Sequence, residues 1–256
     1  MPKERPTITS AAATPAGWSS ERSAELYGIN TWGAGYFDLS EQGEAQVNVD
    51  FGEHQVAVSI MDIVLGMRAR GLHMPAVLRI RNLLDHRIKL LNESFAQAIE
   101  QGGYQNTYRG VFPIKVNQQC HVIEEIADYG RRYHHGFEAG SKAELIIALS
   151  QLKDHGSLIV CNGYKDAEFI DLGLYARQMG IACFFVLESI TELPLVLERS
   201  RILGVEPLIG VRIKNSVAVD GHWSQDSGDR SIFGLSTDSL ISIVDNLRDA
   251  GMLHCL

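Results

Sequence analysis

The sequence predicts an α/β fold, a (β/α)8 TIM-type barrel that is incomplete at the C-terminus and carries an N-terminal appendage. Short apolar segments that resemble buried strands alternate with helical segments over most of the chain, which is typical of parallel βα units. A doubly wound open sheet is the other closure of this pattern. No Gly-x-Gly-x-x-Gly follows the first strand, so the dinucleotide-binding version of that sheet is disfavoured.

The first part of the chain differs from the rest. Residues 1–20 are rich in Pro, Thr, Ser and Ala and are expected to form a disordered arm. Residues 21–73 are expected to form the appendage, with an aromatic and glycine-rich patch, a polar stretch and then a helix over 62–70 that ends at a glycine. The barrel is expected to occupy residues 74–256.

Within the barrel region the alternation predicts six βα units. The expected strands cover residues 76–80, 108–116, 136–138, 158–161, 183–187 and 208–213. The expected helices cover residues 83–101, 122–130, 142–149, 166–179, 191–203 and 238–250. Residues 253–256 would begin a seventh strand. Because a barrel that stops there leaves open strand edges, the chain is expected to be a fragment.

Composition limits the kinds of partner. A chain of 256 residues that is 45% hydrophobic can bury a full core. The net charge of -8 and the lack of a Lys/Arg-dense run argue against nucleic acid and anionic membrane, so a small-molecule partner is expected. Neither a signal-like apolar core nor a run of ~18 apolar residues is present, which predicts a cytoplasmic protein. The four cysteines form no Cys-x-x-Cys pair and fit reduced thiols better than disulfides or a zinc site.

The segment Phe-Pro-Ile-Lys-Val-Asn-Gln at residues 112–118 places Lys115 at the carboxyl end of an apolar strand. In a βα barrel the carboxyl ends of the strands form the active face. A lysine that is partly desolvated there offers a neutral amine that can form an imine with an aldehyde cofactor. The alternative is a lysine that only caps a strand at the solvent edge, since most lysines are exposed.

Glu138 ends the next expected strand. It would therefore lie at the same barrel mouth as Lys115, where it could hold the lysine or move protons near the imine. A plain strand-end carboxylate remains the alternative. Ser141 and Glu144 follow in the register of a capping box, and capping is the role expected of them.

These segments carry a family resemblance. Residues 108–145, the Val-Cys-Asn-Gly-Tyr-Lys-Asp string at 160–166, the Gly-Val-Arg string at 210–212 and the Ser-Ile-Phe-Gly-Leu string at 231–235 resemble the biosynthetic arginine decarboxylase family. That family belongs to the barrel-type decarboxylases that use pyridoxal 5'-phosphate (PLP), alongside ornithine and diaminopimelate decarboxylases. The resemblance runs from about residue 26 to the C-terminus.

The resemblance implies roles for single residues. Lys115 would carry PLP, Glu138 would lie beside the cofactor, and Arg212 would lie close to the imine. On spacing alone, Arg212 could equally form an ordinary strand-end ion pair. Three further residues are possible barrel-mouth residues, although solvated loop positions are the alternative: Asn162, Tyr164 and Lys165.

The resemblance also implies an activity, the PLP-dependent decarboxylation of L-arginine to agmatine and carbon dioxide in polyamine biosynthesis, which leads to putrescine and spermidine. It implies a homo-oligomer and magnesium, for which no oxygen-ligand cluster identifies a site. Relatives usually have Ser-Lys where this chain has Ser231-Ile232, and the family's later elements lie beyond Leu256, so the isolated chain is expected to be inactive. Another barrel-type decarboxylase (ornithine, lysine or diaminopimelate), a non-enzymatic PLP-binding barrel and an inert fragment are the alternatives.

Overall fold

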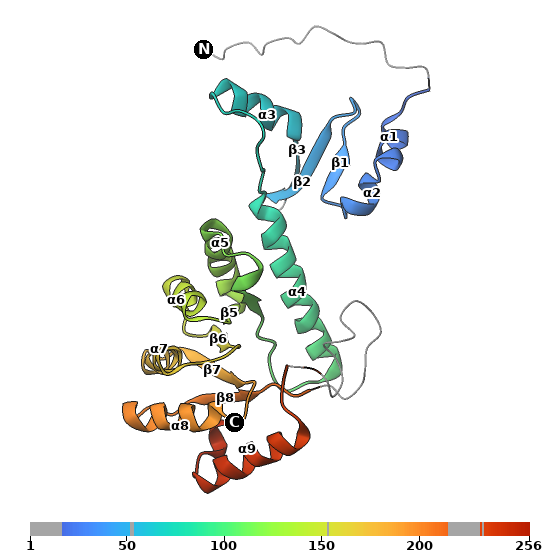
Figure 1. Cartoon of the computed structure of the whole chain (residues 1–256). Coiled ribbons are helices and arrows are strands. Elements are labelled where there is room, and N and C mark those ends of the chain that lie inside the picture. Colours follow the sequence, from blue (N-terminus) through green and yellow to red (C-terminus); the bar gives the residue numbers. More distant parts are fainter. Residues whose placement is uncertain (1–16, 52–53, 153, 215–230, 232) are drawn as a thin grey trace. The chain divides into compact units, whose positions relative to one another are not determined.

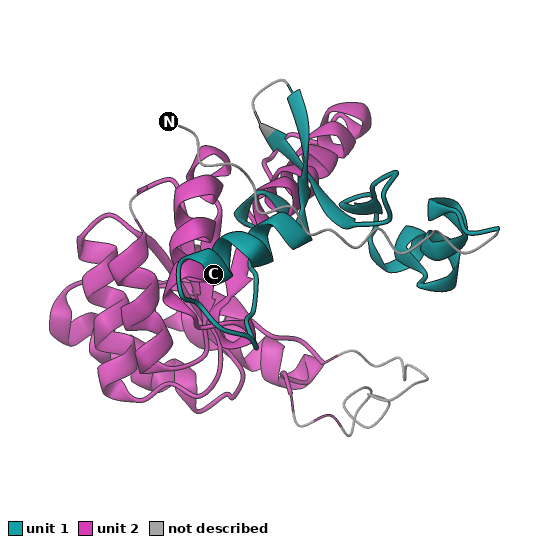
Figure 2. Cartoon of the chain, turned by 90° about the horizontal axis from the view of Figure 1, so that it is seen from above, with its two compact units in different colours: residues 1–83 teal, residues 84–256 magenta. Residues whose placement is uncertain are grey.

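The computed structural model describes residues 17–51, 54–152, 154–214, 231 and 233–256 (Figure 1). Most of the arm expected over residues 1–20 therefore lies outside the described residues. The chain divides into two compact units, Met1–Leu83 and Leu84–Leu256 (Figure 2). None of the described helices combines the length and apolar content that a membrane span requires.

The first unit is built on a three-stranded antiparallel sheet that the sequence analysis did not predict. Its strands pair in the order β1, β2, β3, with Val47 of β2 opposite Val58 of β3. Val47 is only 2% exposed and lies between two polar residues, an alternation that is typical of a half-buried strand. The elements of this unit are α1 (Ser20–Leu26), α2 (Ile29–Trp32), β1 (Phe37–Leu39), β2 (Ala45–Phe51), β3 (His54–Ser59) and α3 (Ile60–Ala69).

The helix expected over residues 62–70 is α3, which begins slightly earlier. Ser59 is its N-cap, and the Ser59 hydroxyl accepts a hydrogen bond of 3.2 Å from the backbone N–H of Asp62. The strand expected over residues 76–80 is wrong. These residues form no strand, and the Val77 side chain is 82% exposed. Apolar content suggested burial there, but a strand also needs a neighbour to pair with.

The second unit confirms the α/β fold with a parallel sheet. After α4 (Arg81–Gly102), five strands pair in parallel in the order of the chain, which is how a barrel of βα units begins. The sheet is not closed, and it has five strands where six were expected because residues 76–80 do not join it. The strands are β4 (Val111–Pro113), β5 (Gly136–Ala139), β6 (Leu158–Cys161), β7 (Ala182–Leu187) and β8 (Leu208–Val211).

Helices follow these strands and cover one face of the sheet. Figure 1 shows α5 to α8 along that side. They are α5 (Cys120–Gly130), α6 (Lys142–Gln151), α7 (Ala167–Gln178) and α8 (Glu192–Leu203), and α9 (Thr237–Asp249) follows β8. The core lies between helices and sheet and includes Phe137, Ile159 and Phe185, each 0% exposed. The bounds of α4 to α9 differ from the predicted ranges by at most two residues at each end.

Besides residues 76–80, three expected strands are shorter than predicted or absent. The strand expected over 208–213 ends at Val211. The segment 108–116 contains only β4, because Ile114–Val116 turns into a short 3-10 helix, η1. The seventh strand expected at 253–256 is wrong, since Leu253–Cys255 forms another 3-10 turn, η4. In this turn the Cys255 N–H donates to the Met252 carbonyl over 3.0 Å. A local hydrogen bond thus replaces the pairing with a neighbouring strand.

Candidate active site

The predicted site residues lie at or just after the carboxyl ends of the parallel strands. Lys115 lies two residues after β4, Glu138 lies within β5, Asn162 directly follows β6 and Arg212 directly follows β8. Because the strands are parallel, these ends meet at one edge of the sheet, the edge that carries active sites in βα barrels.

Lys115 lies in η1 with its side chain exposed. The neighbouring Ile114 is 0% exposed and anchors this turn in the core, and the N–H of Asn117 closes it by donating to the Ile114 carbonyl over 3.1 Å. Among the described residues, the Lys115 amine has no hydrogen-bond or ion-pair partner. The backbone is thus fixed while the amine stays available for reaction.

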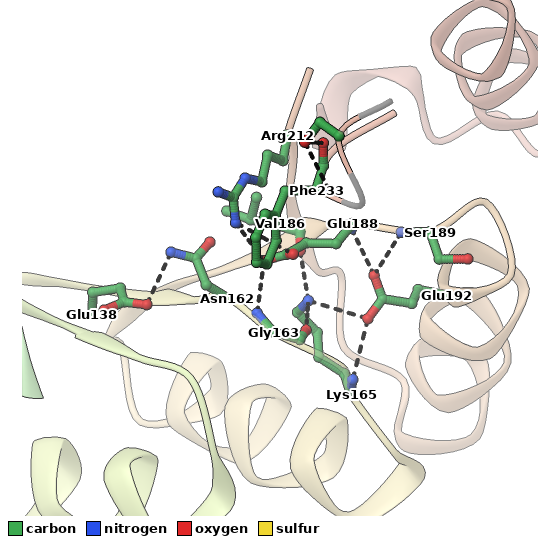
Figure 3. Close-up of polar contacts among 11 residues, drawn as sticks. Glu138, Asn162, Gly163, Lys165, Val186, Glu188, Ser189, Glu192, Arg212 and Phe233 are labelled. Carbon is green, nitrogen blue, oxygen red and sulfur yellow. Dashed lines mark hydrogen bonds and ion pairs between the residues drawn. The ribbon is translucent and has the colours of Figure 1, made fainter. Parts of the chain in front are cut away.

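Glu138 is a buried carboxylate with one free oxygen. Pro113, Glu138 and Val160 are in register across three strands and share a face. The flanking Phe137 and Ala139 are fully buried in the core on the other face, so Glu138 points away from that core. One Glu138 oxygen accepts from the Asn162 amide over 3.1 Å, and the other is buried without a partner in the described part of the chain (Figure 3).

Arg212 supplies a positive charge at the same edge. Its guanidinium lies 4.7 Å from the centre of the Phe233 ring, and its Nη1 lies 3.4 Å from each carboxylate oxygen of Glu188. The side chain is 45% exposed, so the pair with Glu188 is weak and Arg212 can still meet a ligand. Gly234 adopts φ 80°, and a Cβ there would lie 3.0 Å from the Arg212 carbonyl, which explains the glycine of this string.

Lys165 has a different environment from Lys115. It is buried, and its ammonium donates to the carbonyls of Gly163 (2.7 Å) and Val186 (2.5 Å) and to Glu192 Oε1 (3.3 Å). An ammonium has three N–H donors, and all three are used here. Lys165 therefore fixes the loops after β6 and β7 and leaves no donor for a ligand, whereas the neighbouring Tyr164 is 85% exposed.

Sequence reasoning missed two carboxylates of this edge, Glu188 and Glu192. Glu188 directly follows β7 and accepts from the N–H of Gly163 over 2.9 Å. Glu192 is buried and accepts from the N–H groups of Glu188 (2.7 Å) and Ser189 (3.2 Å). Two signals could have found them: an acidic residue at the end of an apolar strand, and the Ser-x-x-Glu spacing of a capping box.

The structure joins some of these residues and not others. Hydrogen bonds link Glu138 to Asn162 and, separately, Gly163 to Glu188 and on to Arg212 (Figure 3). Lys115 has no polar contact with any of them in the described part of the chain. The arrangement offers a free amine, an unpartnered buried carboxylate oxygen and a guanidinium at one sheet edge.

Known proteins resemble this chain over most of its length. Residues 88–254, well over half of the chain, match the model of the family described as pyridoxal-dependent decarboxylase, pyridoxal binding domain. The biosynthetic arginine decarboxylase of Gloeobacter violaceus is 44% identical over 239 residues, which are 93% of this chain and 37% of that protein. The protein of the same name from Synechococcus sp. (strain RCC307) is 43% identical over 92% of this chain and 37% of its own length.

Solved structures resemble the fold. The crystal structure of the biosynthetic arginine decarboxylase from Campylobacter jejuni matches with a TM-score of 0.76 and 30% identity, over 88% of this chain and 36% of that one. The diaminopimelate decarboxylase from Helicobacter pylori, solved with L-lysine, matches with a TM-score of 0.51 and 18% identity over 66% of this chain and 40% of its own, a likeness of fold alone. The chain thus spans little more than a third of the length of these biosynthetic arginine decarboxylases.

Proposed function

The chain belongs to the pyridoxal-dependent decarboxylase family, and on this premise we propose that it is the cofactor-binding part of an arginine decarboxylase. The reaction is the conversion of L-arginine to agmatine and carbon dioxide, a step toward polyamines such as putrescine and spermidine. The single observation that carries the proposal is a set of three groups at the carboxyl edge of the sheet. They are the exposed amine of Lys115, the Glu138 oxygen that has no partner among the described residues, and the guanidinium of Arg212. The names of the relatives support arginine as the substrate.

The three groups fit pyridoxal phosphate. Its aldehyde calls for an accessible amine, which Lys115 provides, and its anionic groups call for a positive charge, which Arg212 provides. The free oxygen of Glu138 calls for a donor, because a buried acceptor without a hydrogen bond costs about 1–3 kcal/mol. A protonated group of the bound cofactor or substrate would supply that donor.

We assign the following roles to the chain's own residues. Lys115 would hold the cofactor covalently, and Glu138, oriented by Asn162, would accept a proton or hydrogen bond at its free oxygen. Arg212 would orient an anionic group of the ligand, while Lys165 and Glu192 hold the surrounding loops. When bound, pyridoxal phosphate supplies the electron sink for loss of the α-carboxylate.

Further features of the family remain proposals. A homo-oligomer and magnesium are expected, and the magnesium has no assigned ligands. Ile232 stands where relatives usually have a lysine, and it lies outside the described residues. Because the chain spans 37% of its relatives, the isolated chain is expected to bind cofactor with little turnover.

The test measures agmatine and carbon dioxide from protein that contains this chain, with PLP and L-arginine, beside a Lys115→Ala variant. Arginine is expected to be preferred over ornithine, lysine and diaminopimelate, and the variant is expected to be inactive. Preference for another of these substrates would overturn the arginine assignment and leave the family intact. Robust turnover by the isolated chain would show instead that it is a complete enzyme.

A further inference from the structure

A second group of reactive side chains lies at the opposite end of strand β8. Glu206 precedes β8 in the loop after α8, and the last turn, η4, brings His254 and Cys255 next to it. His254 Nε2 lies 3.2 Å from Glu206 Oε1, and the potential ligand atoms of all three residues lie within 4.8 Å of one another. Lys115 and Arg212 follow the carboxyl ends of their strands, so this group is separate from the candidate active site.

We propose that Glu206, His254 and Cys255 form a binding site for a zinc ion, with water as the fourth ligand. Thiolate sulfur, imidazole nitrogen and carboxylate oxygen are the ligands that zinc takes in proteins. Magnesium and calcium prefer oxygen ligands alone, so the sulfur and nitrogen of this group discriminate against them. The proposal does not depend on the proposed function.

The observed distances are close to those of a tetrahedral zinc site. Bonds of about 2.0–2.1 Å to nitrogen and oxygen imply about 3.3 Å between these two ligand atoms, and His254 Nε2 and Glu206 Oε1 are 3.2 Å apart. A sulfur at about 2.3 Å would lie roughly 3.6 Å from the other ligands. The Cys255 sulfur lies no more than 4.8 Å from the other two ligand atoms. To reach zinc-site geometry, these separations would have to shorten by about 1.2 Å at most. The side chains of His254 and Glu206 are 58% and 69% exposed and can make this adjustment.

The frame around the group is ordered by local contacts. Met252 N–H donates to the Leu247 carbonyl of α9 over 2.8 Å, and Cys255 N–H donates to the Met252 carbonyl. Cys255 itself belongs to the buried core, so its backbone is anchored. Only the side chains need to move when the metal binds. The metal would link His254 of η4 to Glu206, 48 residues earlier, and so fix η4 beside the start of β8.

Two features of charge bear on affinity. Arg177 Nε lies 3.5 Å from the Glu206 carbonyl, so a guanidinium lies nearby and opposes a dication. The Glu206 carboxylate offsets that charge, and the Cys255 thiol releases its proton to solvent as the metal binds. The spacing of the cysteines does not predict this site, because it consists of one adjacent His-Cys pair and an acidic residue 48 positions before the histidine.

The test uses the purified, tag-free chain and Co²⁺ as a spectroscopic probe for zinc. A thiolate ligand gives cobalt a near-ultraviolet charge-transfer band, and a tetrahedral site gives strong visible bands. We expect one Co²⁺ per chain, displaced by Zn²⁺. Cys255→Ser should remove the charge-transfer band, and Glu206→Gln or His254→Gln should weaken binding at least tenfold. Cys120→Ser is the control, because Cys120 is a free, exposed cysteine outside the group, and its sulfur lies 3.2 Å from a carboxylate oxygen, Glu124 Oε1.

Folding is monitored beside binding, because Cys255 is buried and its variant can fail to fold. Glu206 and His254 are exposed, so their variants should keep the circular dichroism spectrum of the parent. At the same Zn²⁺ concentration, the Tm of the parent chain should rise clearly more than that of Glu206→Gln. Cobalt spectra without a sulfur band, or equal binding by the parent and the exposed variants, would overturn the site.

Discussion

The Asn162 amide donates a hydrogen bond of 3.1 Å to one oxygen of Glu138, while the other oxygen of this buried carboxylate has no partner in the described part of the chain. The contact fixes the carboxylate in one orientation. The fold therefore carries the cost of an unmade hydrogen bond, about 1–3 kcal/mol, at the position where the cofactor is proposed to bind. Such a local cost is typical of functional sites.

Glu138→Gln is expected to separate stability from binding. The amide removes a buried charge, so the free energy of unfolding should stay equal or rise, while PLP affinity should fall about tenfold or more, as for loss of a charged hydrogen bond. Urea unfolding and PLP titration measure the two effects. The control is Glu198→Gln, an exposed charge on α8. Unchanged PLP affinity in Glu138→Gln would remove Glu138 from the proposed site.

Lys165→Met is expected to destabilise the second unit by about 3–5 kcal/mol, because it leaves the buried Glu192 carboxylate without its cation. Urea unfolding at neutral pH measures the change. Lys142→Met is the control: the Lys142 side chain is 40% exposed and bridges Asp166 and Glu168 at the surface, and its loss should cost much less. Equal costs for the two variants would show that Lys165 does not fix these loops.

Gly173→Ala is expected to cost about 1–3 kcal/mol by overpacking the interface between α7 and β7. A Cβ at this position would lie 2.6 Å from the Phe185 ring and 3.2 Å from the Cys183 sulfur. Gly66→Ala in α3 is the matched control, since its Cβ would meet only the end of the Arg70 side chain at 3.4 Å. There the helix should gain up to about 1 kcal/mol. Thermal unfolding of both variants checks the opposite signs.

His135 is expected to make stability depend on pH. Its burial lowers the pKa of the imidazole below the ordinary 6.5. The unfolded chain then binds a proton more readily than the folded one, so stability is lost as the pH falls from 6.5 toward the lower pKa of the folded state, by at most about 1.4 kcal/mol per pH unit. The free energy of unfolding between pH 7.5 and 5.5 should fall less in His135→Gln than in the parent. Identical slopes would contradict a buried neutral His135.

The helices were predictable because the helical period and the capping residues are local. Ser141, for instance, caps α6 by accepting from the N–H of Glu144 over 3.3 Å, as its spacing predicts. Pairing with a distant strand is not local, which is why residues 76–80 were mistaken for a strand. The antiparallel sheet of the first unit joins strands that are neighbours in the chain. It was missed because its many polar residues read as a polar stretch. The Val-Cys-Asn-Gly-Tyr-Lys-Asp string predicted that Lys165 follows β6. Its burial among Gly163, Val186 and Glu192 was not predictable, because it depends on the neighbouring strand.

The central claim is that Lys115 carries pyridoxal phosphate, and covalent labelling tests it most directly. The chain is incubated with PLP, reduced with borohydride, digested and examined by mass spectrometry, beside Lys115→Ala. The account predicts a pyridoxyl group mainly on Lys115, little on Lys142, whose ammonium is paired with two carboxylates, and none on the buried Lys165. The main label should be lost in the variant. A label spread evenly over exposed lysines, or retained in Lys115→Ala, would contradict it.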